Sequence, residues 1–402
     1  MTHARLRPKG RALATAAMLA LVLHPSASAA GERHYSIDVG AGAGVATNPF
    51  LTDPSRSGAY FDLRLDPHAS YVSERSTTTI EGQSDLRRYL NGLGTSSSYG
   101  VIIHRSTRYS ERLTLDGSLA FNSSKNDDRR LNSFFDGGQG GVPVGSSVDP
   151  IGVLLTPGQR RTLASAQLEA SLRLNERDNA SFGASADREI ISNAPVPSNF
   201  WSFGTNAQFR RALSPSSSIG AELSVNRIEY DAGEGGYTVL KPQLIFSRQL
   251  SPSFNVTGSV GALIVNGSAY GRSRKLFSVS GNTTGCRTGD VSSLCATISQ
   301  DAGGSGVGGL RVGRQAYLSY SRKIGPDNRL TLNSGISHYG RGDLPGAGPS
   351  TQWQVGGGWE RKVSNHLKTV ADVGYRHALL GMRAATDLFA RVGISLRVGD
   401  VK

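Results

Sequence analysis

The chain has 402 residues, of which 38% are hydrophobic and 50 are glycine. An ordinary soluble domain would carry longer apolar runs and clearer helical periodicity, and no stretch beyond the N-terminus is long enough to form a transmembrane helix. The formal net charge of +13 suggests an anionic partner, either lipopolysaccharide outside or a negatively charged substrate inside, although scattered solvated charge explains it equally well.

The first thirty residues predict a cleaved secretory signal. Four basic residues, the last of them Arg11, precede an apolar run from Ala12 to Leu23, and small residues follow up to Ala30. The run is too short to span a hydrocarbon core of about 30 Å. We therefore expect residues 1–30 to be removed and residues 31–402 to form one domain.

The mature chain shows period-two alternation of apolar and polar side chains. Its clearest example runs from Ser247 to Asn266, where a strand ends at Leu250, a polar turn follows, and a second strand begins at Phe254. One face of that second strand is apolar and the other is polar or small, which is typical of a wall between lipid and water.

Sixteen strands of this kind are expected along the chain. Their approximate ranges are 34–48, 59–71, 77–89, 98–109, 113–122, 161–174, 180–191, 200–213, 219–230, 237–250, 254–266, 307–322, 330–339, 352–361, 368–376 and 387–398. Seven short polar turns alternate with eight longer loops, and the long polar segments 123–158 and 267–306 are two of those loops.

This regular alternation predicts an all-β, transmembrane, antiparallel up-and-down barrel with short periplasmic turns and long extracellular loops. Both termini then lie on the periplasmic side. A soluble β-sandwich has no reason to show two such different ends, and a propeller would not carry inserts of such unequal size.

Alternation also assigns polar side chains to the barrel interior. The expected lumen residues are Asp62, Arg64, Asp66, His68, Glu81, Gln83, Asp85, Arg87, Asp116, Glu169, Arg173, Asn206, Gln208, Arg210, Glu222, Arg311, Gln315, Arg391 and Arg397. They either contact a solute or pair with one another across strands and keep the wall rigid. Two further charged groups, Asp127-Asp128-Arg129-Arg130 and Arg272, Arg274 and Lys275, either charge the outer mouth or solvate exposed loops.

The two cysteines, Cys286 and Cys295, are nine positions apart in the polar segment 267–306. In an exported protein this spacing predicts a local disulfide. The sequence contains no catalytic motif and no cluster of metal ligands, so we expect neither an enzyme nor a cofactor.

The glycine-rich segment from Ser36 to Phe50 resembles the first strand of outer-membrane β-barrel proteins from exopolysaccharide gene clusters. The repeated Arg-x-Leu-Ser-Pro turns at 211–215 and 248–252 are similar too. The resemblance implies export or surface assembly of a polysaccharide from the outer membrane of a Gram-negative bacterium. Outer-membrane lipid, lipopolysaccharide, polysaccharide and periplasmic export proteins would be its partners, and no nucleic acid is expected.

Two other functions fit the same pattern. The first is a passive diffusion porin for small solutes, with segment 123–158 as its constricting loop. The second is a structural or adhesive surface barrel with a plugged lumen, which a long disulfide-closed outer loop would suit.

Overall fold

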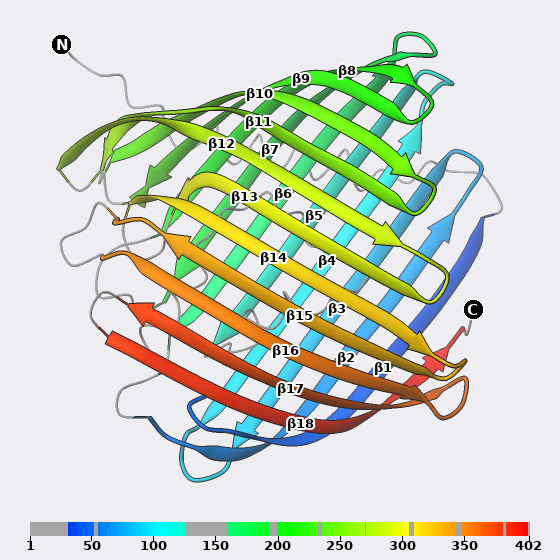
Figure 1. The fold of residues 1–402 in the computed structure, drawn as a ribbon, viewed down its shortest axis with the longest axis vertical. Helices are drawn as coiled ribbons and strands as arrows, with labels where there is room; N and C mark the ends of the chain where they lie inside the picture. The colour runs from blue at the N-terminus through cyan, green and yellow to red at the C-terminus, as the bar shows by residue number, and fades with distance from the viewer. Residues whose placement is uncertain are drawn as a thin grey trace.

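Each strand pairs in antiparallel fashion with the strand before it, and the last strand pairs with the first, so the sheet closes on itself (Figure 1). The computed structural model describes residues 31–51, 55–125, 159–192, 199–231, 235–269, 271–304, 309–342, 348–380 and 383–400. No helix within these ranges is long and apolar enough to cross a membrane.

The described barrel has 18 strands. They are β1 (Glu32–Ala46), β2 (Gly58–Val72), β3 (Ser76–Tyr89), β4 (Thr95–Arg108), β5 (Leu113–Lys125), β6 (Arg160–Arg173), β7 (Asp178–Ile191), β8 (Phe200–Ser214), β9 (Ser217–Tyr230), β10 (Gly235–Ser251), β11 (Phe254–Ala269), β12 (Arg272–Thr288), β13 (Ser292–Gly304), β14 (Leu310–Ile324), β15 (Asn328–Tyr339), β16 (Ser350–Lys362), β17 (Leu367–Leu380) and β18 (Arg383–Gly399).

The outer surface of the barrel is apolar because alternate side chains of every strand point outward. On β18, Leu388, Val392 and Ile394 are each more than half exposed, while Asp387, which precedes Leu388 and points to the opposite face, is buried. An exposed apolar surface around a closed sheet matches the hydrocarbon of a bilayer. The predicted fold class, an antiparallel up-and-down barrel, is confirmed.

The two ends of the barrel differ. Turns such as that between β8 and β9 span only a few residues at one end, which we call the short-turn end. The longer connections lie at the other, the long-loop end, together with short ones such as that between β11 and β12. β1 begins and β18 finishes at the short-turn end, where Asp400 binds the backbone N–H of Tyr35 at 2.9 Å.

The strand count differs from the sixteen that the pattern predicts, because β12 and β13 occupy most of the expected loop 267–306. Gly281, Thr283 and Gly285 stand where lipid-facing side chains are expected on β12, so its alternation is weak. In the sequence a strand is recognised by apolar side chains at every second position, and β12 lacks several of them. In the structure β12 is a strand because its backbone pairs with β11 along its length.

Several predicted features lie outside the described residues. These are the signal segment 1–30, the acidic and basic group Asp127, Asp128, Arg129 and Arg130, and most of the expected constricting loop 123–158.

Candidate functional site

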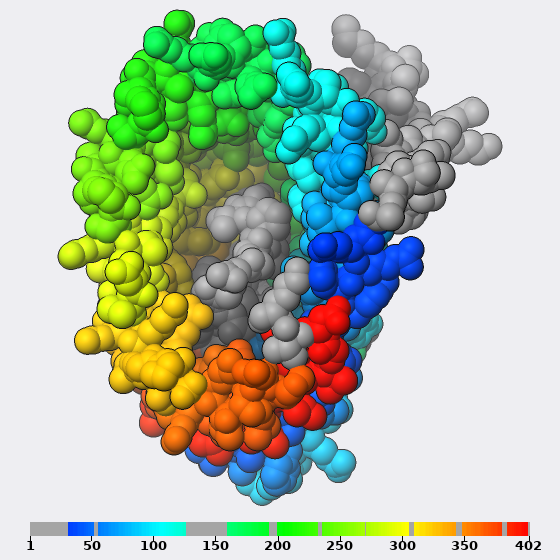
Figure 2. Space-filling model, turned by 90° about the vertical axis from the view of Figure 1, so that its right-hand side faces the viewer, coloured from blue at the N-terminus to red at the C-terminus, as the bar shows by residue number. Residues whose placement is uncertain are grey.

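The barrel wall encloses a hollow interior. Figure 2 looks into the short-turn end and shows the described strands as a ring around this hollow. Since alternate side chains of a strand point to opposite faces, the residues between the lipid-facing ones line the interior, which we call the lumen.

The structure turns the predicted lumen candidates toward this interior, as their register with neighbouring strands requires. Asp62 and Arg64 alternate with exposed Phe61 and Leu63, for example, and Arg391 follows the same rule on β18. The candidates are spread over several strands, however, and they form several separate pairs and no single site.

The most connected of these groups centres on Arg391. Its guanidinium donates hydrogen bonds to both carboxylate oxygens of Asp62, at 2.8–3.2 Å, and to Asp372 at 3.1 Å. The Asp62 carboxylate is fully buried, so this ion pair is shielded from solvent on one side. Such charge-assisted, forked hydrogen bonds fix the side chain of an arginine.

The glycine-rich first strand makes this contact possible. β1 lies between β2 and β18, and Gly42 is paired with Asp62 on one side and with Gly393 on the other. A Cβ atom at Gly42 would lie 2.8 Å from the Asp62 carboxylate and 3.1 Å from Arg391 Nε. Because Gly42 has no side chain, the Arg391 guanidinium can cross β1 and reach the Asp62 carboxylate.

A second set of ion pairs lies nearer the short-turn end. Arg397 donates two hydrogen bonds to Asp38, at 2.6 and 2.8 Å, and Arg64 pairs with Asp66. Lys368 contacts Glu360 at 3.1 Å. Most of the charges on this side of the lumen are thus neutralised within the wall.

Two fully buried pairs stand at the long-loop end. Arg161 binds Glu189 at 2.7 Å, and Arg376 binds Asp387. Asp387 also accepts the backbone N–H of Asn48 at 2.8 Å, and therefore ties the β1–β2 connection to β18. The Arg376–Asp387 pair therefore holds this connection in place.

The remaining candidates have local roles. Arg87 lies over the Tyr60 ring and donates to Tyr89 Oη, while Arg311 donates to the carbonyls of Gly340 and Gly348. The other candidates lie elsewhere on the lumen wall and do not contact the Arg391 group. Glu81 faces His68, Gln83 donates to Asp85, and Asp116 is paired with Glu169 across the β5–β6 ladder. Arg173 and Arg210 lie toward the short-turn end, and Glu222 lies between Gln208 and Gln243.

Sequence reasoning missed several charged lumen residues, and four of them illustrate the reasons. Asp38, Asp372, Lys241 and Asp301 each bind a partner across the inner surface. The alternation that assigned Arg391 to the lumen also applies to Asp38, Asp372 and Lys241, so the same rule could have found them. Asp301 lay in a segment interpreted as a loop.

The long-loop end of β13 and β14 folds into the lumen. Ala302 and Leu310, from these strands, pack in one buried cluster with inward side chains of β8 to β11, among them Phe200 and Tyr237. Gly304 lies against Phe200, where an added Cβ would come within 2.9 Å of the ring. This inward-folded end, residues 301–304 and 309–312, therefore crosses the inner face of β9 to β12.

Polar contacts tether the inward-folded end. Lys241 on β10 binds Asp301 at 2.8 Å, and Arg274 on β12 donates to the Leu310 carbonyl at 2.6 Å. Lys241 and Asp301 belong to strands that are not neighbours in the sheet. The contact narrows the lumen at the long-loop end.

The fold of this end leaves a short seam between β12 and β13. Only eight residue pairs join the two strands, from Gly281–Gln300 to Thr288–Ser293, against eleven between β1 and β18. No described residue of β13 pairs with residues 272–280, and the two strands separate at the left of Figure 1. Gln300 fills part of the gap by donating to the Val279 carbonyl at 2.6 Å.

The disulfide joins Cys286 and Cys295 across this seam. Both cysteines are on paired strands that meet at a short turn, and they face each other in register. The expectation that they close a long outer loop is wrong, because the polar segment that holds them forms a hairpin whose turn lies at the short-turn end.

The sequence pattern assigns the basic trio to the same outer loop, either at its mouth or as solvated loop charge. The structure puts Arg272, Arg274 and Lys275 on β12, near its long-loop end. Arg274 is committed to the Leu310 carbonyl, while Lys275 takes the outward face with Phe277.

The wall opposite the Arg391 group is richer in uncharged polar side chains. Inward positions of β9 to β13 include Asn226, Gln243, Ser280 and Thr284, and Gln243 donates to Ser280 Oγ at 2.8 Å. The lumen thus presents charged pairs on one side and, beside Glu222 and the Lys241–Asp301 pair, mainly hydroxyl and amide groups on the other. This combination hydrogen-bonds hydrophilic solutes.

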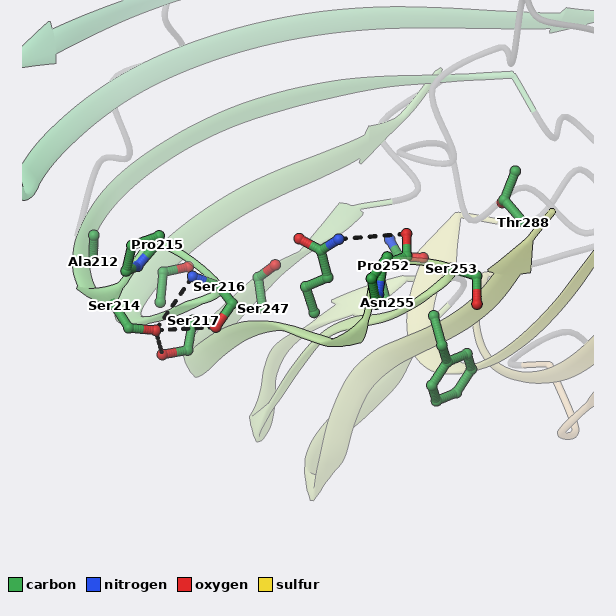
Figure 3. Close-up of a pocket in the computed structure, with 13 residues that line it drawn as sticks. Ala212, Ser214, Pro215, Ser216, Ser217, Ser247, Pro252, Ser253, Asn255 and Thr288 are labelled. Carbon is green, nitrogen blue, oxygen red and sulfur yellow. Dashed lines mark hydrogen bonds between the residues drawn. The ribbon is translucent and has the colours of Figure 1, made fainter. Parts of the chain in front are cut away.

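A hollow of about 470 Å³ lies at the short-turn rim between the β8–β9 and β10–β11 turns (Figure 3). Ser214 bonds Ser217 Oγ at 2.7 Å, and Gln249 donates to the Pro252 carbonyl at 3.5 Å. No charged side chain lines this hollow. The two Ser-Pro-Ser turns therefore give this part of the rim an uncharged polar surface.

No group of three or more His, Cys, Asp or Glu side chains that could hold a metal ion occurs among the described residues. The lumen arrangement supplies fixed charges and hydrogen-bonding groups along a passage, which suits the binding and passage of a solute.

Solved structures with a similar barrel include three from Pseudomonas aeruginosa. They are OprD (TM-score 0.45, 11% identity, 93% of this chain and 98% of that one), the outer membrane protein opdK (0.47, 10%, 91% and 99%) and OccK2 (OpdF), solved in complex with glucuronate (0.49, 10%, 92% and 98%). At such identities the likeness concerns the shape of the barrel alone. No protein-family model and no curated protein sequence matches the chain.

Proposed function

We propose that this protein is a channel of the Gram-negative outer membrane that lets small hydrophilic solutes diffuse through its lumen. The observation that supports it is the closed 18-stranded barrel with an apolar outside and a hollow, polar inside (Figure 2). A barrel of this strand number is wide enough for an aqueous passage.

The lumen wall defines the class of solute. Charged pairs on β17, β18, β1 and β2 face a wall of β9 to β13 that carries mainly hydroxyl and amide groups. Small solutes that carry hydroxyl groups, with or without a carboxylate, can exchange their water for these groups as they pass.

Single-channel conductance of the refolded protein in a planar bilayer tests this function, together with the swelling of protein-loaded liposomes in sugars of increasing size. We expect a steady conductance and swelling that falls with sugar size. A protein that is folded and inserted but shows neither conductance nor swelling would refute the diffusion channel.

Polysaccharide export, which the family resemblance implies, would use the same lumen for a polymer leaving the cell. It remains a prediction, and its test is different: deletion of the gene should reduce surface polysaccharide. An unchanged polysaccharide layer together with a conducting barrel would leave the diffusion channel as the function.

A further inference from the structure

Three basic side chains gather on the lipid-facing side of β3, β5 and β6 at the long-loop end. Arg88 follows the outward Leu86, Lys125 lies on the face of Phe121, and Arg160 lies on the face of Leu168. Most lumen cations described above have an acidic partner. Within the described chain no carboxylate pairs with Arg88, Lys125 or Arg160.

Lys125 and Arg160 are directly opposite each other in the β5–β6 ladder. Like charges in this position repel when nothing lies between them. Arg160 is nevertheless fixed, because its guanidinium donates to Ser123 Oγ at 3.1 Å and to Ser97 Oγ at 3.3 Å and lies 5.3 Å from the centre of the Tyr99 ring. The guanidinium is therefore held beside Lys125 without neutralising it.

Two outward cations farther around the long-loop end are neutralised by the protein itself. Arg188 binds both carboxylate oxygens of Asp231, at 2.8 and 2.6 Å, and Arg227 lies 3.6 Å from Glu229. Arg88, Lys125 and Arg160 differ from these two arginines in having no carboxylate partner among the described residues.

The depth of the three cations fits a lipid headgroup. Next to them toward the middle of the barrel, the Tyr99 and Phe121 rings are 6.2 Å apart, and Val101 follows on the same face. Aromatic rings mark the boundary between hydrocarbon and headgroups in membrane barrels, and basic side chains reach outward from that level.

We propose that Arg88, Lys125 and Arg160 bind a phosphate group of a phosphorylated glycolipid in the outer leaflet. A phosphate accepts forked hydrogen bonds from a guanidinium and the charge of an ammonium, and it removes the repulsion between Lys125 and Arg160. The acyl chains of the same lipid then cover the apolar surface formed by Phe121, Val101 and their neighbours.

Native mass spectrometry of the purified, delipidated protein tests the site, with a bisphosphorylated glycolipid as the probe. We expect the variant Lys125→Gln/Arg160→Gln to bind this lipid at least tenfold more weakly than wild type. The matched control is Arg248→Gln/Arg322→Gln, which removes two outward cations from the short-turn end and should bind like wild type.

Two further arms identify the ligand. The dephosphorylated glycolipid should bind wild type and the Lys125→Gln/Arg160→Gln variant equally weakly, and millimolar inorganic phosphate should not displace the bound lipid. Equal loss in both double variants, or wild-type binding that is indifferent to the lipid phosphate, would overturn the proposal. Conductance of the Lys125→Gln/Arg160→Gln variant should match wild type, so this result is independent of the proposed channel.

Discussion

Arg391 on β18 holds the carboxylate of Asp62 on β2 across the strand that separates them. The contact crosses β1 at Gly42, and the two residues are 329 positions apart in the chain. Because β1 and β18 are also the strands that close the barrel, the pair braces the closure from inside.

Gly42→Ala should weaken this brace. The new Cβ would lie 2.8 Å from the Asp62 carboxylate and 2.9 Å from the Val392 carbonyl, which is too close for either atom. We expect a loss of about 1–3 kcal/mol in the free energy of unfolding, as for other overpacked sites. The measurement is the denaturant midpoint of the barrel in liposomes.

Gly40→Ala is the control for that substitution. It lies on the same face of β1, but its Cβ would meet only Arg64 Cβ at 3.5 Å and the Ile394 carbonyl at 3.6 Å, which are ordinary contacts. Equal destabilisation by both changes would show that the cost comes from placing a side chain in β1 and not from displacing the ion pair.

Removal of one partner of the ion pair should cost more than removal of both. Arg391→Gln takes away the guanidinium that donates to both oxygens of the buried Asp62 carboxylate, and breaking comparable buried pairs costs about 3–5 kcal/mol. Asp62→Asn/Arg391→Gln restores an uncharged pair and should recover more than half of that loss. A double-mutant cycle of unfolding free energies measures the coupling, and additive losses would contradict it.

The first and last strands show what sequence reasoning achieves here. A membrane requires apolar side chains at every second position of a strand, so the outward face of β18 is readable from Leu388 to Val398 without a structure. The Arg391–Asp62 contact was not readable in the same way, because it depends on the register of two strand pairs and on closure of the barrel.

The missed strands have a different cause. β12 and β13 carry glycine, serine and threonine on both faces, so lipid contact leaves a faint pattern there. Some alternation of apolar and polar residues does remain, at Phe277 and Val279 on β12 and at Leu294 and Ile298 on β13. The two cysteines also lie at equal distances from the short turn. Those signals could have identified a hairpin in place of a loop.

Asp301→Asn should widen the long-loop end of the lumen. The substitution removes the ion pair with Lys241 that tethers the inward-folded end to β10, while the size of the side chain is kept. We expect a larger mean single-channel conductance than in wild type, because that end then moves away from the lumen axis.

Glu360→Gln serves as the matched control, since it removes a carboxylate from the Lys368 pair near the short-turn end. Its conductance should stay close to that of wild type. An equal rise in both variants would attribute the effect to lumen charge. No rise in Asp301→Asn would show that the apolar cluster around Phe200 and the Arg274 hydrogen bond hold the inward-folded end without the Lys241 pair.

Loss of the disulfide should loosen the β12–β13 seam before any other part of the barrel. The bond closes a short loop, worth roughly 2–3 kcal/mol in the chain-entropy account, and it reinforces a ladder of only eight residue pairs. We expect Cys286→Ser/Cys295→Ser to fold, because those backbone hydrogen bonds remain.

Amide hydrogen exchange should then accelerate at residues 281–288 and 293–300 and stay unchanged between β1 and β18. Reduction of the wild-type protein should reproduce the same local pattern. Uniform acceleration around the barrel would mean that the disulfide stabilises the fold as a whole, and unchanged exchange would mean that the ladder holds the seam unaided.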